Sequence, residues 1–534
     1  MQSSIALEQP QTQELGYKAA SPSPRDSRSW LWLAVAVTLL VFANGVDSIP
    51  LAAWLAPLFV LRFVRTQSLK VGLPVAYVVL IATFPIQFRG MVPIPGIAYY
   101  IFLLVNGIPA VLPYVLDRLL TRRLTGLRAT LVFPAAWAAT EYLTSLAQYG
   151  SWGSAAYAMF GNLPLLQLLS VTGLWGITFL LGWFASTCNL LWEEGFASPR
   201  ARRGAWACFG TIATVLFLGG LRMALFPPSS QTVRVASISD RTVGPELDMP
   251  VKIRMFEGKA TSEDMVAIRP WATAIDDDLM SRAEREMQAG AKVVFWGEAD
   301  AKLLKEDEAA FIARGQALSA KYNAYFGMAV GVLSMGKPRP LENKLVLIQP
   351  DGKVAWEYHK AHPVPGFEDK MQVLSDGKLR SLDTPYGRLS SVICFDADFP
   401  QLLAQGGALG ADIMLVPSND WQQIDPWHTQ MASLRAIEQG FNLIRHTSHG
   451  LSAAYDYQGR QLAAMDHFRT TDYALVSEVP TKGVRTIYSR LGDWFAWMCL
   501  AGLLVVTIGT LRQGIRSREL RAFVTLAVLF ASRS

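Results

Sequence analysis

SSVICFDADFP, residues 390–400, forms a short apolar strand that ends on a cysteine and continues into acidic and aromatic residues. This pattern marks the second half of the chain as a domain that contains a β-sheet. A sheet holds the end of a strand rigidly while the following loop exposes it, so catalytic groups collect at such ends. Cys394, which closes the predicted strand from Ser390, is therefore a candidate nucleophile.

Strand-length apolar runs recur on both sides of this stretch, through residues 228–492, with helical patterns between some of them. A mixed order of this kind predicts a layered α/β domain, and the segment is long enough to bury one large core. The predicted strands are Val233–Ser239, Val293–Glu298, Tyr325–Val332, Lys344–Gln349, Leu389–Phe395, Ile413–Pro417 and Asn442–Thr447, and the predicted helices are Thr273–Ala289, Glu306–Ala320 and His428–Gln439.

The composition of the whole chain excludes several protein classes. Charged residues make up 17% of the 534 residues and hydrophobic residues 51%, whereas a soluble domain usually carries about 25% charge. The 16 Trp, 26 Phe and 16 Tyr argue against disorder, and four Cys exclude a disulfide scaffold. The net charge of +6 sits beside apolar runs, so we expect a membrane and no nucleic acid as the partner.

Residues 29–227 consist mainly of apolar runs, and a bilayer core needs roughly 20 apolar residues as helix. Basic residues cluster after every second run, with Arg89 as the exception, and the positive-inside rule places those loops in the cytoplasm. This predicts cytoplasmic tails at 1–28 and 512–534, and a residue 228 that emerges on the outer side. The candidate spans are residues 30–47, 50–64, 71–88, 97–116, 129–146, 165–192, 205–226 and 494–511.

Two further strand ends carry residues that a cysteine nucleophile would need. VVFWGE, residues 293–298, places Glu298 where an apolar strand stops, and WEYHKAH, residues 356–362, places Lys360 in a short loop after a strand. A thiol needs a base to remove its proton, and an oxyanion needs a cation or N–H donors. Each residue taken singly also fits a surface ion pair, and periodicity does not bring the three together.

A metal site is not predicted. The sequence has neither H-E-x-x-H nor C-x-x-C, and the spaced pair of His446 and His449 has no nearby carboxylate. Catalysis by a Cys–His pair remains an alternative that would need a histidine close to Cys394. The remaining histidines in this region are His359, His362, His428 and His467, and the other cysteines, Cys188, Cys208 and Cys499, lie in apolar spans as buried hydrophobes.

The order and local context of Glu298, Lys360 and Cys394 resemble the carbon–nitrogen hydrolase (nitrilase) superfamily. Within it, the chain is most similar to the membrane-embedded apolipoprotein N-acyltransferase family, because flanking stretches along most of the chain also match. These stretches are FPAAWAATEY at 133–142, DGK at 351–353, YHKAHPVP at 358–365, NDW at 419–421 and WHTQMASLRAIE at 427–438. The resemblance implies an α-β-β-α sandwich over residues 228–492, joined to a bundle of about seven spans at 29–227 and a last span at 493–511.

The resemblance also assigns roles within the site. It implies Glu298 as the base, Lys360 as the oxyanion cation and Cys394 as the nucleophile, with Glu368 and Asn343 in support. Three features depart from the family pattern: Gly297, the order Gly366-Phe367, and Asp396. Asp396 is expected to be a further supporting residue, and an aspartate at this position is more typical of the soluble amidases. Trp296, Phe395 and Trp421 are expected to contact substrate, and no cofactor is expected.

The implied reaction is transfer of a fatty acyl chain through a thioester in the bacterial inner membrane, with the catalytic domain on the periplasmic side. The donor would be a phospholipid, with phosphatidylethanolamine implied by the resemblance. The acceptor would be the α-amine of the diacylglyceryl-cysteine of an apolipoprotein. Two alternatives stay open: a membrane-tethered amidase or nitrilase that acts on a small molecule, and a membrane protein that binds lipoproteins without catalysis.

Overall fold

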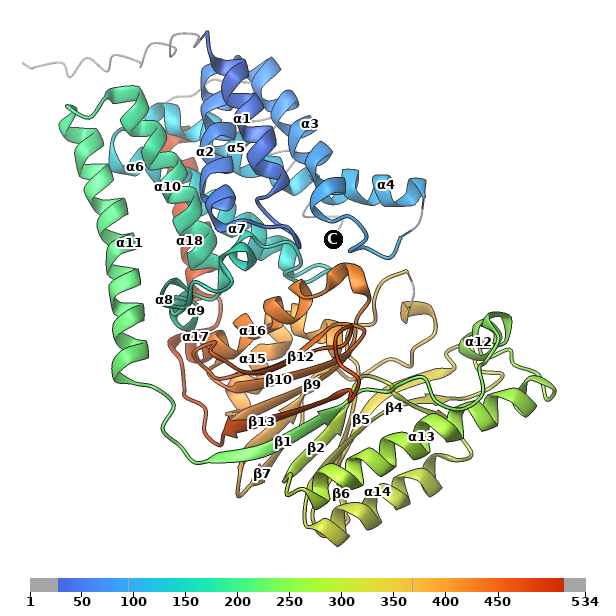
Figure 1. Ribbon diagram of the computed structural model, residues 1–534. Helices are drawn as coiled ribbons and strands as arrows, with labels where there is room; N and C mark the ends of the chain where they lie inside the picture. The colour runs from blue at the N-terminus through green and yellow to red at the C-terminus, as the bar shows by residue number, and fades with distance from the viewer. Residues whose placement is uncertain (1–26, 95, 367, 513–534) are drawn as a thin grey trace, which may run out of the picture.

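The computed structural model describes residues 27–94, 96–366 and 368–512. Helices from the first part of the chain and the last helix form one bundle, and the segment between them forms an α/β domain below it (Figure 1). This confirms the predicted fold class of a helical membrane bundle joined to an α/β domain. The predicted tails lie almost entirely at residues 1–26 and 513–534, outside the described part of the chain.

A helix lies in each of the eight predicted spans. Five helical segments of the described chain are long and apolar enough to cross a membrane: Leu69–Gln87, Ile97–Arg123, Leu174–Glu194, Pro199–Leu225 and Trp494–Arg512. The number of crossings stays a prediction, because three of the eight helices are shorter. The helices of the bundle are α1 Ser29–Val41, α2 Pro50–Thr66, α3 Leu69–Gln87, α4 Ile97–Asn106, α5 Ile108–Leu120, α6 Leu127–Thr130, α7 Val132–Ser145, α8 Leu163–Leu166, α9 Leu169–Thr172, α10 Leu174–Glu194, α11 Pro199–Leu225 and α18 Trp494–Arg512.

Two predicted spans are interrupted by glycine. Gly107 separates α4 from α5, and in Figure 1 α4 projects sideways from the bundle rather than running along it. Gly173 has a φ of +64°, which a residue with a side chain rarely adopts, so the predicted span 165–192 becomes two short turns followed by α10. The continuous apolar composition of both segments hides these breaks.

The α/β domain is a sandwich of two mixed sheets with helices on both outer faces (Figure 1). The first sheet has the order β13-β1-β2-β4-β5-β6, with β3 paired to β4, and the second has the order β12-β11-β10-β9-β8-β7. Parallel pairs at the centre of each sheet, β1–β2–β4 and β8–β9–β10, bring the ends of several strands to one edge. The strands are β1 Thr232–Ile238, β2 Val293–Trp296, β3 Ala301–Leu304, β4 Tyr325–Leu333, β5 Leu341–Ile348, β6 Val354–His359, β7 Ser381–Thr384, β8 Gly387–Ser391, β9 Ile413–Asn419, β10 Asn442–Ser448, β11 Leu451–Tyr455, β12 Gln461–Asp466 and β13 Ala474–Pro480.

Alternation along each strand divides the core into layers, because successive side chains point to opposite faces of a sheet. On β2, Val293 and Phe295 pack between the sheets against Ile413 and Leu415 of β9. Val294 and its neighbours on the outer face pack on the helices instead. The helices of the domain are α12 Met249–Phe256, α13 Asp264–Gln288, α14 Glu308–Tyr322, α15 Pro400–Leu409, α16 Trp427–Gln439 and α17 Ile487–Leu491.

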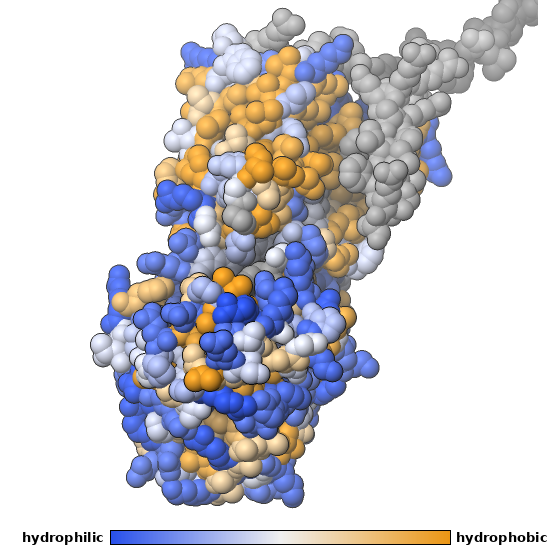
Figure 2. Space-filling view, turned by 90° about the vertical axis from the view of Figure 1, so that its right-hand side faces the viewer, coloured by the Kyte–Doolittle hydropathy of each residue, from blue (hydrophilic) through white to orange (hydrophobic). Residues whose placement is uncertain are grey.

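The surface is apolar over the bundle and polar over the α/β domain, as the composition of the two sequence regions predicts. Figure 2 shows hydrophobic colour gathered on the helical half and hydrophilic colour over most of the α/β half. A bundle surrounded by lipid tails requires such an apolar exterior. Exposed apolar side chains of the bundle include Val78, Ile97, Ile101, Leu104, Val105, Trp206, Phe217, Leu218, Leu225, Trp497, Leu504 and Val505.

Buried polar contacts join the two parts. Arg435 of α16 donates to Ser151 Oγ at 2.7 Å and forms an ion pair with Glu438, whose other oxygen accepts from the backbone of Leu174 at 2.9 Å. The Trp421 indole donates to the carbonyl of Gly90 at 2.9 Å. Because these partners come from opposite parts, the bundle and the sheet edge are held in one arrangement.

Candidate active site

Cys394 lies in a tight turn rather than in a strand. The predicted strand Leu389–Phe395 is too long: β8 ends at Ser391, and Cys394 opens a 3-10 turn that ends at Asp398. Cys394 has a φ of +49°, in the left-handed region that costs a residue with a side chain of order 1–3 kcal/mol. Such strain persists only where the surroundings enforce it, and it is common at nucleophiles.

The Asp396 carboxylate holds Cys394 in this left-handed conformation. Its Oδ2 accepts from the Ile393 backbone N–H at 3.1 Å and from the Tyr358 hydroxyl at 2.8 Å. Its Oδ1 accepts from the backbone N–H groups of His362 at 2.7 Å and Ala361 at 3.1 Å. One buried carboxylate therefore ties the cysteine turn to the loop that carries the candidate lysine.

Glu298 lies two residues after the last residue of β2, and β9 contacts it from the second sheet. Its Oε1 accepts from Lys360 Nζ at 2.7 Å and from Asn343 Nδ2 at 2.6 Å, and its Oε2 accepts from the Asn419 backbone N–H at 3.1 Å. Asn343 on β5 thus helps to hold the carboxylate. The structure brings Glu298, Lys360 and Asn343 together although 62 and 45 residues separate the partners of these bonds.

Lys360 is fully buried between two carboxylates. Its Nζ donates to Glu298 Oε1 and, at 2.6 Å, to Glu368 Oε2, which also accepts from the Val364 backbone at 2.8 Å. Burial alone would lower the pKa of Lys360, but the two glutamates raise it well above its usual range. Burial also raises the pKa of Glu368. Lys360 is therefore a fixed cation, and Glu368 holds it in place.

The Cys394 thiol is protonated at rest. Burial raises its pKa well above the usual range, and the Glu298 carboxylate raises it further, whereas Lys360 lowers it. The thiol donates to the Asn419 carbonyl, with 3.9 Å between Sγ and the oxygen. A thiol in this state needs a base at the moment of attack, because only the thiolate is a strong nucleophile.

A cavity of about 490 Å³ opens beside these groups, and both parts of the molecule line it. Glu298, Glu368, Asn343 and Cys394 form the wall on the α/β side. The bundle contributes an apolar wall of Met91, Val92, Pro93, Ile94, Phe102, Tyr149 and Trp152. The cavity therefore combines a polar wall that carries Cys394 with an apolar wall from the bundle.

The three aromatic residues expected to contact substrate have different places. Phe395 and Trp421 line the cavity. Trp296 instead lies in the core, where its indole donates to the Ala329 carbonyl at 2.9 Å and packs edge-on against Phe326. Trp296 falls on the outer face of β2 by alternation, so the structure removes it from the residues that contact substrate.

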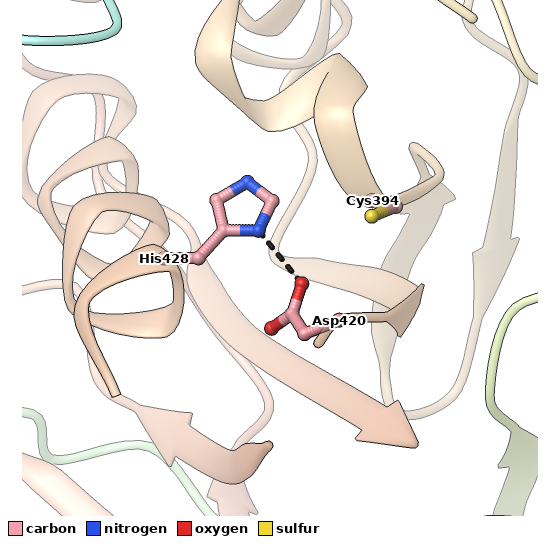
Figure 3. Close-up of side chains that lie close together, drawn as sticks. All are labelled: Cys394, Asp420 and His428. Carbon is pink, nitrogen blue, oxygen red and sulfur yellow. Dashed lines mark hydrogen bonds and ion pairs between the residues drawn. The ribbon is translucent and has the colours of Figure 1, made fainter. Parts of the chain in front are cut away.

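The sequence did not single out Asp420 and His428 as site residues, but both line the cavity beside Cys394. Figure 3 shows Asp420 after β9 and His428 at the start of α16, with the Asp420 carboxylate turned toward the His428 ring and the Cys394 sulfur beside the pair. The potential ligand atoms of the three residues lie within 4.8 Å of one another. The Arg445 guanidinium engages Asp420 through both oxygens, at 2.7 and 2.9 Å.

The comparisons with known proteins agree with this geometry. The model of the apolipoprotein N-acyltransferase N-terminal domain matches residues 36–187, and the carbon–nitrogen hydrolase model matches residues 271–486. The chain belongs to the apolipoprotein N-acyltransferase family. An apolipoprotein N-acyltransferase of Geobacter metallireducens is 26% identical over 76% of this chain and 78% of its own, and one of Bradyrhizobium diazoefficiens is 27% identical over 73% and 75%.

Among solved structures, an amidase from Nesterenkonia sp. is 17% identical and aligns over 48% of this chain and 92% of its own, with a TM-score of 0.37. Membership in the apolipoprotein N-acyltransferase family makes the protein a multi-span membrane enzyme of lipoprotein N-acylation. The family acts on a lipid acyl donor and an apolipoprotein acceptor, and the cavity that joins an apolar wall to a thiol suits both.

Proposed function

We propose that this N-acyltransferase moves a fatty acyl chain from a phospholipid, phosphatidylethanolamine in the first instance, to the α-amine of a diacylglyceryl-cysteine through a thioester on Cys394. The observation that carries the proposal is the composite cavity. A buried thiol and a carboxylate line it together with an apolar wall made by the bundle, and the fixed cation Lys360 is bonded to that carboxylate.

In the first half-reaction, Glu298 takes the thiol proton and Cys394 Sγ attacks the ester carbonyl carbon of the phospholipid. Lys360 Nζ and the backbone N–H of Phe395 stabilise the oxyanion, and the loss of one such donor typically costs about 2.7–4 kcal/mol. Glu298 then gives its proton to the departing lysophospholipid oxygen. The acyl-enzyme waits for the amine, in a ping-pong sequence.

We also propose that the α/β domain lies on the periplasmic side. Arg65 of α2 is paired with Asp117 of α5 at 2.7 Å, and Arg123 donates to the Thr510 carbonyl at the end of α18. These contacts gather the basic helix ends at one side of the bundle, opposite the α/β domain (Figure 1). The positive-inside rule assigns that side to the cytoplasm.

The test is incubation of the purified protein with phosphatidylethanolamine that carries a labelled acyl chain, followed by intact-protein mass spectrometry. We expect an acyl adduct on Cys394, no adduct on C394A, and transfer of the label to a diacylglyceryl-peptide with a free amine. Absence of the wild-type adduct would refute the thioester. Release of free fatty acid at the same rate with and without the peptide would favour the amidase alternative.

A further inference from the structure

A second polar cluster lies beside the sulfur, and the roles given to Glu298, Lys360 and Cys394 leave it without a function. His428 Nδ1 lies 2.8 Å from Asp420 Oδ1, and the Arg445 Nη2 lies at the same distance from that ring nitrogen. Arg445 is in turn held by Asp420 and by Thr429 Oγ1 at 2.6 Å. The ring is therefore fixed in orientation at the wall of the cavity.

The other ring nitrogen of His428, Nε2, faces a carboxylate. It is buried, and so are both carboxylate oxygens of Asp398, for which the described residues offer no other side-chain partner. His428 Nε2 and Asp398 Oδ1 face each other at 3.4 Å. When Nδ1 donates to Asp420, the tautomer leaves a lone pair on Nε2, and a proton placed there would be received by Asp398. Ionisable groups that are buried together at the wall of a cavity are candidates for a function, and the roles given above do not use this pair.

The second half-reaction supplies one, because it releases a proton that Glu298 does not absorb. The acceptor arrives as an ammonium, since an α-amino group has a pKa of about 7.7–8.0. One proton must leave before the nitrogen attacks, and a second leaves the tetrahedral intermediate. Glu298 returns only one of them, to the sulfur, as the carbon–sulfur bond breaks.

We propose that His428 is a further catalytic residue, the base that accepts the first proton of the acceptor ammonium; this inference rests on the proposed function. The ammonium N–H bond breaks, the Nε2–H bond forms, and the freed electron pair attacks the thioester carbonyl carbon. Glu298 takes the second proton from the intermediate and delivers it to Sγ. The proton on Nε2 is held by Asp398 until it is lost to water.

The charges around His428 suit this task. Burial and the Arg445 guanidinium lower the pKa of His428, and Asp398 and Asp420 raise it by more, so the net direction is upward. Cys394 is the other titratable group close to the ring among the described residues, and the Trp152 ring packs against it edge-on. A base works best with a pKa near the operating pH, and an upward shift from 6.5 brings that of His428 closer to that of an amine.

The test separates the two half-reactions with H428Q. We expect the variant to form the acyl-enzyme at close to the wild-type rate from labelled phosphatidylethanolamine, and to discharge it to the diacylglyceryl-peptide about 100-fold more slowly at pH 7, as for loss of a general base. The deficit should shrink as the pH rises above the amine pKa. Hydroxylamine, whose nitrogen is unprotonated at pH 7, should discharge both acyl-enzymes equally.

Two further variants complete the design. D398N preserves the volume of the side chain that faces Nε2 and removes its charge, so it should lower the pKa of His428 and displace the acid limb of discharge to lower pH. H446Q is the matched control, because His446 is a fully buried histidine that packs near Phe295, in the layer between the sheets; its discharge profile should not change.

Wild-type discharge of the peptide by H428Q would overturn the proposal. An equal slowing with hydroxylamine, or a parallel loss of acylation, would do the same and would leave His428 a structural role. If the wild-type protein forms no acyl-enzyme, the thioester mechanism itself fails, which is a different result. If the acid limb of the discharge profile is unchanged in D398N, Asp398 does not hold the proton on His428 Nε2.

Discussion

Replacement of Glu298 by glutamine should move two reactions of Cys394 in opposite directions. The carboxylate raises the pKa of the thiol through its charge, yet it is also the base that removes the thiol proton in the proposed mechanism. The glutamine side chain would keep the shape of the glutamate and one oxygen for the bonds from Lys360 and Asn343. E298Q therefore removes the charge and the basicity, and of the bonds to the carboxylate it loses the one that Oε2 accepts from the Asn419 backbone N–H.

The magnitudes follow from these two roles. A neighbouring charge at such a site typically shifts a pKa by about 1–3 units, so loss of the Glu298 charge should raise the thiolate fraction of Cys394 about tenfold or more below its pKa. Alkylation of Cys394 by iodoacetamide at pH 8 should become faster by about that factor. Acyl-enzyme formation should fall by a factor of roughly 10²–10⁴, as for loss of a general base.

Intact-protein mass spectrometry measures both rates on the same sample, with iodoacetamide in one arm and labelled phospholipid in the other. K360M is the control of opposite sign, because Lys360 lowers the pKa of Cys394. Its loss should slow alkylation as well as acylation. If E298Q slows both reactions in parallel, the base role is wrong and Glu298 acts only by holding the site together.

Two other substitutions test how the site is held. D396N should leave at least one backbone N–H of the cysteine turn or the lysine loop facing an amide N–H. A hydrogen bond to a charged group contributes about 1.5–3 kcal/mol, so we expect slower acylation and about 10–100-fold faster hydrogen exchange in residues 358–362 and 393–397. Unchanged exchange would contradict the positioning role of Asp396. W421F removes the hydrogen bond from the indole to the Gly90 carbonyl, which contributes about 0.5–1.5 kcal/mol. This substitution should raise KM for phospholipid more than it lowers kcat. An unchanged KM would show that this contact at the rim of the cavity is dispensable.

The sequence predicts the chemistry of this site better than its geometry. Glu298, Lys360 and Cys394 became candidates because each follows a predicted strand and because a thiol nucleophile needs a base and a cation, and the family resemblance then grouped the three. The left-handed backbone of Cys394 depends on Asp396 in the same turn, and this carboxylate is held in place by the lysine loop, which is distant in the sequence. His428 was missed because its partner Asp398 belongs to the cysteine turn, which only the packing of α16 brings near.

The fold shows the same limit. Hydropathy separated the bundle from the α/β domain, and strong apolar runs predicted the central strands β1, β2, β4, β9 and β10. The edge strand β12, with most of its side chains at least partly exposed, has no such run and was missed. Gly173 breaks the predicted span 165–192 in a way that composition does not reveal, because the residues around it are as apolar as those of a continuous helix.

The wall that the bundle adds to the cavity explains how hydrolase-like machinery could favour transfer. A thioester beside bulk water would be hydrolysed, whereas Val92, Phe102 and Trp152 place apolar surface opposite Cys394. That surface suits acyl chains and excludes water, which strengthens the interactions of Lys360 with a developing oxyanion. The buried contacts between Arg435 and Ser151, and between Trp421 and Gly90, keep this wall in register with the sulfur. The choice of an amine over water as acceptor would then depend on the junction between the two parts as much as on the residues that perform the chemistry.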